Sequence, residues 1–282
     1  MLFDARMVAP AQGYSPSAQK PAQALQSWQA NGMAIEVMPF EPLSAEQISS
    51  AHCPAYVEGV LKGEIANGFG THAPEVAASL PYTTGAMYAA ALVALVNQQV
   101  ACAPVSGFHH AHWNAGGAFC TFNGLMVTAM LLQRMQPDIR VGILDLDEHW
   151  GDGTDQIIGQ LGAAGWVSHF SGTQGYGTKH RAELFLNDLP SILKTHFSRC
   201  DVVLYQAGAD CHVDDPLGGW LTTEQMRKRD ELVFAGLSTL RVPVAWNLAG
   251  GYQEPIERVL ELHDNTMRVC CTHASVNSSA RE

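Results

Sequence analysis

The chain has 282 residues, of which 47% are hydrophobic and 15% charged, and its formal net charge is -11 at pH 7. This composition supplies ample apolar side chains for a core and excludes a natively disordered chain. The acidic balance, with no run of Lys and Arg, argues against a broad nucleic-acid-binding face.

Cysteine usage and the N-terminal sequence indicate in which cellular compartment the protein is expected. There are seven cysteines, an odd number without C-x-x-C spacing, which favours a reducing compartment over a disulfide framework. The N-terminus has no basic start followed by an apolar run, so no signal peptide is predicted. The sequence contains no uncharged apolar run of about 18 residues, so no transmembrane helix is predicted. We therefore expect a soluble cytoplasmic protein.

The first half of the chain is predicted to be irregular and then helical. Residues 1–30 are rich in Pro, Ala, Gln and Ser and are predicted to form an irregular N-terminal segment. Mostly apolar stretches predict buried helices over 83–100 and 123–136, and Pro137 ends the second.

Short apolar segments alternate with helical ones in the second half. The predicted strands cover 141–147, 166–170, 201–210 and 242–252. The predicted helices cover 181–198, the segment after a capping box formed by Thr222 and Gln225, and the segment from about Glu254. This alternation predicts one α/β domain over 1–282, with a mostly parallel sheet and helices on both faces. Ligands of such sheets bind outside the carboxyl ends of the strands.

The segment "ILDLDEHWGDGTDQ", 143–156, carries acidic residues at the end of a predicted strand. In an extended chain Asp145, Asp147 and His149 point to the same side. Buried carboxylates repel each other unless a cation lies between them. Asp147 and His149, with Asp210 after a later strand, would give zinc or another first-row ion three ligands and one open position. The alternative is a strand end that opens into solvent, where Asp147 caps a turn.

Two further segments carry candidate catalytic groups. "PVSGFHHAHWNAGGAFCTFN", 104–123, contains the tandem His109 and His110, which suit a general base and an electrostatic partner if carboxylates such as Asp145 and Asp152 fix their tautomers. "AGGY", 249–252, places Tyr252 at a strand end, where a phenol can donate to a developing oxyanion. The alternatives are two surface histidines in a loop and a structural tyrosine in a tight turn.

Four segments occur in an order that resembles a known family: "SGFHHAHWNAGGAFCTFN", "DLDEHWGDGTDQ", "AGADCHVDDPLGG" and "LAGGY". They are similar to the zinc-dependent histone deacetylase family, which includes bacterial acetylpolyamine amidohydrolases and has an arginase-like α/β fold. The resemblance spans roughly residues 50–265. It implies a metal-dependent amidohydrolase that removes an acetyl or acyl group from an amine.

The resemblance also implies roles for individual residues. The implied ligands of one zinc ion are Asp147, His149 and Asp210. His110 is the implied general base, His109 the second histidine, and Tyr252 the donor to the oxyanion. The carboxylates behind His109 and His110 are Asp145 and Asp152. The resemblance also implies a bound monovalent cation, such as K+, at Asp145 and Ser168. The implied walls of the substrate tunnel are Gly117, Phe119, Tyr176 and Leu217.

Departures from the family pattern bear on the substrate. No acidic residue stands in "NGFGTHAPE", 67–75, where many members carry one at the tunnel rim. Leu217 stands where a polyamine-selective relative has a glutamate, which favours acetyl-lysine. Three alternatives stay open: an acetylpolyamine or other small-molecule amidohydrolase, a catalytically silent relative that binds acylated ligands or proteins, and an arginase-like enzyme with two manganese ions. Neither nucleic acid nor membrane is an expected partner, and a homo-oligomer is compatible with the sequence.

Overall fold

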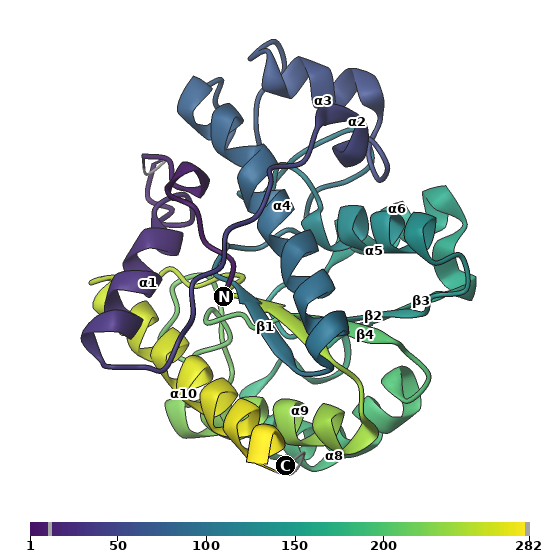
Figure 1. The fold of residues 1–282 in the computed structure, drawn as a ribbon. Coiled ribbons are helices and arrows are strands. Elements are labelled where there is room, and N and C mark those ends of the chain that lie inside the picture. Colours follow the sequence, from purple (N-terminus) through teal and green to yellow (C-terminus); the bar gives the residue numbers. More distant parts are fainter. Residues whose placement is uncertain (11–12, 280–282) are drawn as a thin grey trace.

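A five-stranded parallel sheet runs through the middle of the computed structural model, which describes residues 1–10 and 13–279 (Figure 1). Its strand order is β1-β5-β4-β2-β3. The strands are β1 (Val100–Ala103), β2 (Val141–Asp145), β3 (Val167–Ser171), β4 (Val202–Gln206) and β5 (Val244–Asn247). β2, β4 and β5 are buried along their whole length, and their sequences are apolar up to a final polar residue.

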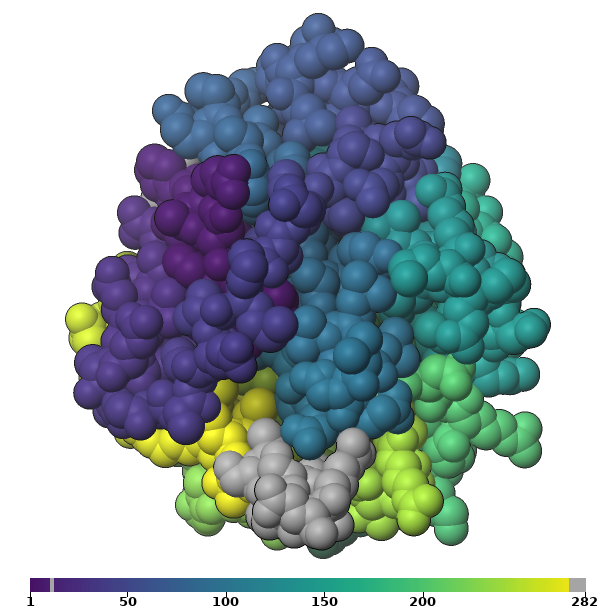
Figure 2. Space-filling view, in the orientation of Figure 1, coloured from purple at the N-terminus to yellow at the C-terminus, as the bar shows by residue number. Residues whose placement is uncertain are grey.

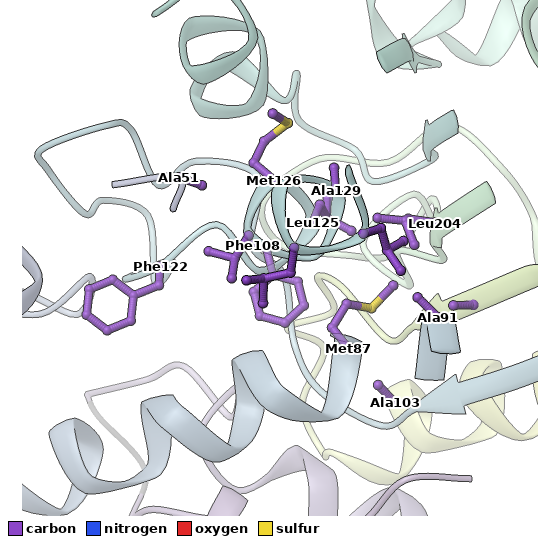
Figure 3. Packing of buried hydrophobic residues seen from close by; sticks show 14 of the residues in the cluster. Ala51, Met87, Ala91, Ala103, Phe108, Phe122, Leu125, Met126, Ala129 and Leu204 are labelled. Carbon is purple, nitrogen blue, oxygen red and sulfur yellow. The ribbon is translucent and has the colours of Figure 1, made fainter. Parts of the chain in front are cut away.

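Helices cover both faces of this sheet and enclose a separate hydrophobic core on each (Figure 1). The first core includes side chains of α4 (Pro74–Asn97) and α5 (Gly124–Met135), with α6 (Asp152–Leu161) beside them. Figure 3 shows Met87, Phe108, Leu125 and Leu204 packed together in it. The second core includes side chains of α1 (Lys20–Ala30), α8 (Ala182–Phe197), α9 (Thr223–Leu240) and α10 (Glu257–Ser279).

The remaining elements are short and lie in the connections. They are η1 (Ala5–Met7), α2 (Ala45–Ile48), α3 (Pro54–Leu61), η2 (Ala163–Gly165), α7 (Thr173–Tyr176) and η3 (Lys179–Arg181). The capping box of Thr222 and Gln225 is present at the start of α9, as predicted.

The prediction of an irregular segment over 1–30 is wrong for residues 20–30, which form a helix. Residues 5–7 form η1, and α1 begins at Lys20 with Pro21 in its first turn and buries Ala24 and Trp28, one helical turn apart. In Figure 2 the N-terminal part of the chain, purple, lies against the C-terminal helix α10, yellow. Ser27 Oγ donates to Asp264 Oδ2 of α10 at 2.9 Å.

The long helix α4 differs from its prediction in two ways. It begins at Pro74 rather than at 83, and it ends at Asn97, because the next residue, Gln98, has a left-handed φ of 56°; residues 100–103 then form β1. By length and composition α4 would suffice to cross a membrane, contrary to the sequence-based expectation. Half of its most apolar 18-residue window is nevertheless buried inside the protein, as in the core helix of a globular domain.

Candidate active site

Four loops that follow strands meet at the carboxyl edge of the sheet. The loop after β1 carries His109 and His110, and the loop after β2 carries Asp147 and His149. The loops after β4 and β5 carry Asp210 and the segment 249–252. Because all the strands are parallel, these loops leave the sheet at the same edge, which is where such sheets bind ligands.

Asp147, His149 and Asp210 form a group that could hold one metal ion. One ligand atom from each lies within 4.8 Å of the other two, and the part of the chain that the structure describes contains no second group of this kind. His149 Nδ1 is 3.3 Å from Asp147 Oδ1 and 3.3 Å from Asp210 Oδ2. Both carboxylates are buried, whereas the His149 side chain is 37% exposed. The group therefore has one side open toward the cavity.

The chemistry of this group fits a divalent cation. Asp210 Oδ2 is buried and has no hydrogen-bond partner. Burial and the adjacent Asp147 raise the pKa of Asp210 to about 8. A cation between the two carboxylates would remove this unfavourable electrostatic interaction. Two oxygen ligands and one imidazole suit zinc, and they also suit iron(II) or cobalt(II).

Gly250 allows the backbone after β5 to approach the two carboxylates. Its N–H donates to Asp147 Oδ2 at 2.8 Å. A Cβ at this position would lie 2.0 Å from Asp210 Oδ2 and 2.9 Å from Asp147 Oδ2. Only glycine fits here, which explains one of the two glycines in "AGGY".

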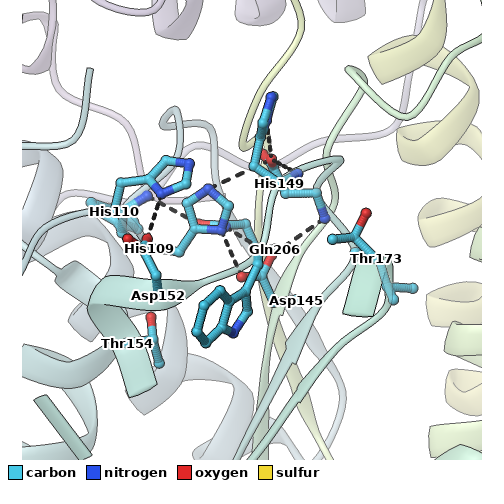
Figure 4. A network of polar contacts seen from close by, with 12 residues as sticks. His109, His110, Asp145, His149, Asp152, Thr154, Thr173 and Gln206 are labelled. Carbon is cyan, nitrogen blue, oxygen red and sulfur yellow. Dashed lines mark hydrogen bonds and ion pairs between the residues drawn. The ribbon is translucent and has the colours of Figure 1, made fainter. Parts of the chain in front are cut away.

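His109 lies between a carboxylate and the metal group (Figure 4). Its Nδ1 is 2.7 Å from Asp145 Oδ2, and its Nε2 is 3.5 Å from Asp147 Oδ1. Burial opposes protonation of this ring, but Asp145 and Asp147 outweigh it and raise the pKa of His109 to about 9. His109 is thus suited to carry a positive charge near neutral pH.

The pKa of His110 is shifted in the opposite direction to that of His109. Its Nδ1 is 2.6 Å from Asp152 Oδ1, and its ring centroid is 4.0 Å from that of His109 and 5.8 Å from that of His149. Burial and the neighbouring His109 lower the pKa of His110 below the ordinary histidine value. With Nδ1–H donated to Asp152, Nε2 keeps a lone pair and can accept a proton.

A cavity of approximately 190 Å³ joins these groups. Its lining includes Tyr252 together with His109, His110, Asp147 and His149. Burial raises the pKa of the Tyr252 phenol well above its usual value, so the hydroxyl keeps its proton and can donate it in a hydrogen bond. The Tyr252 backbone N–H is fixed by Asp215 Oδ2 at 2.8 Å.

The predicted tunnel residues divide into two groups. Phe119 and Leu217 line the cavity, and the Phe119 ring lies 5.5 Å from those of both Tyr14 and Tyr252. Gly117 does not line it; the lining residue beside it is Ala118. The prediction for Tyr176 is wrong, because its hydroxyl donates to Asp188 and its ring packs on Phe185 in the second core.

The predicted monovalent-cation pair is not brought together. Ser168 pairs in register with Gly142, three residues before Asp145 on β2. The residue opposite Asp145 is Ser171, whose Oγ is buried and has no hydrogen-bond partner. A monovalent cation beside Asp145 would therefore be held with Ser171, and an unsatisfied buried hydroxyl fits that role.

Sequence reasoning missed two residues at the site, Tyr14 and Lys20. Tyr14 lines the cavity, and Lys20 is fully buried with Nζ donating to the carbonyl of Ala249 at 2.6 Å. Lys20 thereby supports the backbone turn that leads to Gly250. The signal for its helix was Pro21 followed by Ala24 and Trp28 at helical spacing.

Comparisons with known proteins agree on the family and the fold. The histone deacetylase domain model matches residues 15–176. An uncharacterized protein from Picosynechococcus is 30% identical over 227 residues, which are 74% of this chain and 75% of that protein. Histone deacetylase 14, chloroplastic, from Arabidopsis thaliana is 27% identical over 225 residues, but the match covers only 53% of that protein and 65% of this chain.

Two solved structures have the same fold. The HDA15 HD domain superposes with a TM-score of 0.77 at 18% identity and covers 97% of this chain and 88% of that one. An acetylpolyamine aminohydrolase from Burkholderia pseudomallei superposes with a TM-score of 0.71, also at 18% identity, and covers 97% and 98%. At this identity the likeness establishes the fold, and the family follows from the domain match and the 30% identical relative. On these grounds the chain belongs to the histone deacetylase family.

Proposed function

We propose that the protein hydrolyses the amide bond of N-acetylated amines, with acetyl-lysine as the favoured substrate class. Its cofactor in this proposal is one divalent metal ion, for which zinc is the first choice. The observation that carries this proposal is the convergence of the Asp147, His149 and Asp210 group with a carboxylate-backed base, His110, and a phenol donor, Tyr252, in one cavity. The family is one of hydrolytic enzymes, which supports deacetylation as the reaction.

The chain's own residues account for the proton movements. When bound, a divalent ion would acidify a water molecule and polarise the acyl carbonyl. Nε2 of His110 takes the proton from the attacking water, while Asp152 holds Nδ1 and stabilises the imidazolium that forms. His110 then returns the proton to the nitrogen of the leaving amine.

The oxyanion that develops on the acyl oxygen is stabilised by two further groups. The Tyr252 hydroxyl donates a hydrogen bond to it, and His109, whose pKa Asp145 raises, lies next to His110 in the lining of the cavity. Asp145 fixes the orientation of His109 through its Nδ1 at 2.7 Å. These donors are already in place, so little reorganisation is needed during the reaction.

The lining of the cavity favours an aliphatic stem over a polycation. Among the described residues that line it, the only acidic one is Asp147, which belongs to the metal group. Leu217, Phe119 and Tyr252 offer apolar surface to the methylene groups of a lysine side chain. The net charge of -11 would still draw a cationic peptide toward the molecule at long range.

The test compares an acetyl-lysine peptide with a monoacetylated diamine, using protein loaded with zinc. We expect faster hydrolysis of the peptide, and we expect His110→Ala to lower this activity by at least about 100-fold while the protein keeps its metal. Preference for the diamine would overturn the assignment of the substrate class. No turnover of either compound, at one ion per chain, would replace the proposal with a silent binding protein.

A further inference from the structure

His169 lies between two carboxylates beneath the candidate active site. It belongs to β3, and its side chain is only 5% exposed. Its Nδ1 is 2.6 Å from Asp155 Oδ1, and its Nε2 is 3.9 Å from Asp145 Oδ2. Asp145 is the carboxylate that orients His109. His169 contacts Asp145 on its other side, so the series of contacts leading away from the cavity is His109, Asp145 and then His169.

The hydrogen bonds around this ring determine which atoms carry protons. Asp155 already accepts a hydrogen bond from Trp150 Nε1 at 2.8 Å, and the short contact to its other oxygen requires His169 Nδ1 to donate. His169 Nε2 is buried and has no partner within hydrogen-bond distance. The nearest charged group that it faces is Asp145 Oδ2. A lone pair there would repel the carboxylate, whereas an N–H attracts it, so the ring donates toward both sides.

Gly151 provides a second, independent observation. A Cβ on this residue would lie 2.5 Å from Asp145 Oδ2, 3.1 Å from His169 Cε1 and 3.2 Å from His169 Nε2. The backbone at Gly151 therefore borders the space in which the imidazole and the carboxylate face each other. A side chain at this point would push Asp145 and His169 apart.

The carboxylate of Asp145 has hydrogen-bond donors on both oxygens, and His169 faces Oδ2 as a further N–H group. Oδ1 accepts from Gln206 Nε2 at 3.0 Å and from the Asp147 backbone N–H at 3.3 Å (Figure 4). Oδ2 accepts from His109 Nδ1, with His169 on its other side. A fully buried carboxylate needs such partners to stay ionised and in a fixed orientation.

We propose that His169 is a positioning residue for the deacetylation reaction: its Nε2–H faces the Asp145 carboxylate at 3.9 Å and attracts it electrostatically, which keeps that carboxylate where it orients His109. This inference rests on the proposed function for its kinetic consequence, but its structural consequence can be measured without any substrate. Nothing in the family motifs quoted above assigns a role to this histidine.

Two substitutions separate the two nitrogens of the ring. In His169→Asn the amide nitrogen takes the place of Nδ1, so donation to Asp155 is kept and the N–H that faces Asp145 is lost. In His169→Gln the amide nitrogen reaches the place of Nε2, so an N–H still faces Asp145. The matched control is His180→Asn, at an exposed histidine of η3.

The kinetic measurement is kcat and KM on the acetyl-lysine peptide at saturating zinc. We expect His169→Asn to lower kcat by about 10-fold with KM unchanged, by analogy with the 10- to 100-fold loss usual when the hydrogen-bond partner of a metal ligand is removed. His169→Gln should stay close to the unmutated protein, as should His180→Asn. Equal losses in both His169 variants that follow their melting temperatures would show a purely structural role and overturn the proposal.

The second measurement is the imidazole N–H resonance of His109 in the zinc-loaded protein, which its hydrogen bond to Asp145 moves downfield in the proton NMR spectrum. We expect it to shift in His169→Asn and to stay in place in His169→Gln. An unmoved resonance in His169→Asn would overturn the proposal even if the protein hydrolysed no acylated amine. Failure of the proposed function is thereby kept distinct from failure of this inference.

Discussion

Replacing Gly250 with alanine is the most direct structural perturbation of the metal group. The added methyl group would lie 2.0 Å from Asp210 Oδ2, and ordinary van der Waals contact begins at 3.4 Å. Asp210 must therefore move by more than 1 Å or the backbone after β5 must retreat. The second option would break the hydrogen bond from the Gly250 N–H to Asp147 Oδ2.

Either movement exceeds what a metal site tolerates, because ligand distances are held to within about 0.2 Å. Loss of a partner of a ligand costs about 10- to 100-fold in metal affinity, and displacement of the ligand itself costs at least as much. We therefore expect Gly250→Ala to weaken zinc binding by about 100-fold or more. The fold should persist, because the substitution lies at the edge of the sheet and leaves both hydrophobic cores intact.

The assay is zinc affinity, measured by competition with a chromogenic chelator, together with the melting temperature. The matched control is Gly159→Ala on the exposed face of α6, where an added Cβ meets nothing within 4 Å. That change should leave zinc affinity unchanged and stabilise the helix by about 1 kcal/mol. If Gly250→Ala bound zinc as tightly as the unmutated protein, the argument that Asp210 is a ligand in this geometry would be refuted.

Three further substitutions test the roles of two active-site residues and of one buried histidine. His110→Ala should lower kcat by about 100- to 10,000-fold, the range for loss of a general base, at unchanged metal content by mass spectrometry; a loss smaller than tenfold would contradict its role. Tyr252→Phe should lower kcat by about 100-fold with little change in KM, because it removes one donor to the oxyanion; an effect on KM alone would assign Tyr252 to substrate binding instead. His52 is buried with its Nε2 accepting from the Asn123 N–H, and burial lowers its pKa to about 4. Since an unfolded histidine takes up a proton near pH 6.5, the free energy of unfolding should fall by up to about 3 kcal/mol from this residue as the pH drops from 6.5 to 4. Urea denaturation of His52→Gln should show a smaller decrease over that range, and an equal decrease in both proteins would contradict this assignment.

Much of the fold could be predicted because the signals are local. The strands β2, β4 and β5 are short and mostly apolar, and the capping box at Thr222 marks the start of α9. The position of Asp147, His149, Asp210 and Tyr252 after strands then followed from the geometry of parallel sheets. The resemblance to the family added the pairing of the histidines with Asp145 and Asp152, and the structure has both contacts.

The remaining features depend on tertiary contacts. β1 is a four-residue strand directly after a long apolar helix, so periodicity could not separate the two. Residues 1–30 have a weak local pattern, and α1 is held in place by packing against α10. The prediction that Ser168 lies beside Asp145 is wrong because the register of β3 against β2 depends on tertiary packing, which neither strand sequence specifies. Tyr176 lies in a short helix whose direction only the structure could give.

The central claim is that a divalent ion at Asp147, His149 and Asp210 supports amide hydrolysis. The most direct test is deacetylation of an acetyl-lysine peptide by the same preparation before chelation, after chelation and after titration with zinc. We predict that chelation abolishes activity and that zinc restores it in proportion to occupancy, reaching a plateau at one ion per chain. Activity that survived complete removal of the metal, or a plateau at two ions per chain, would contradict this account.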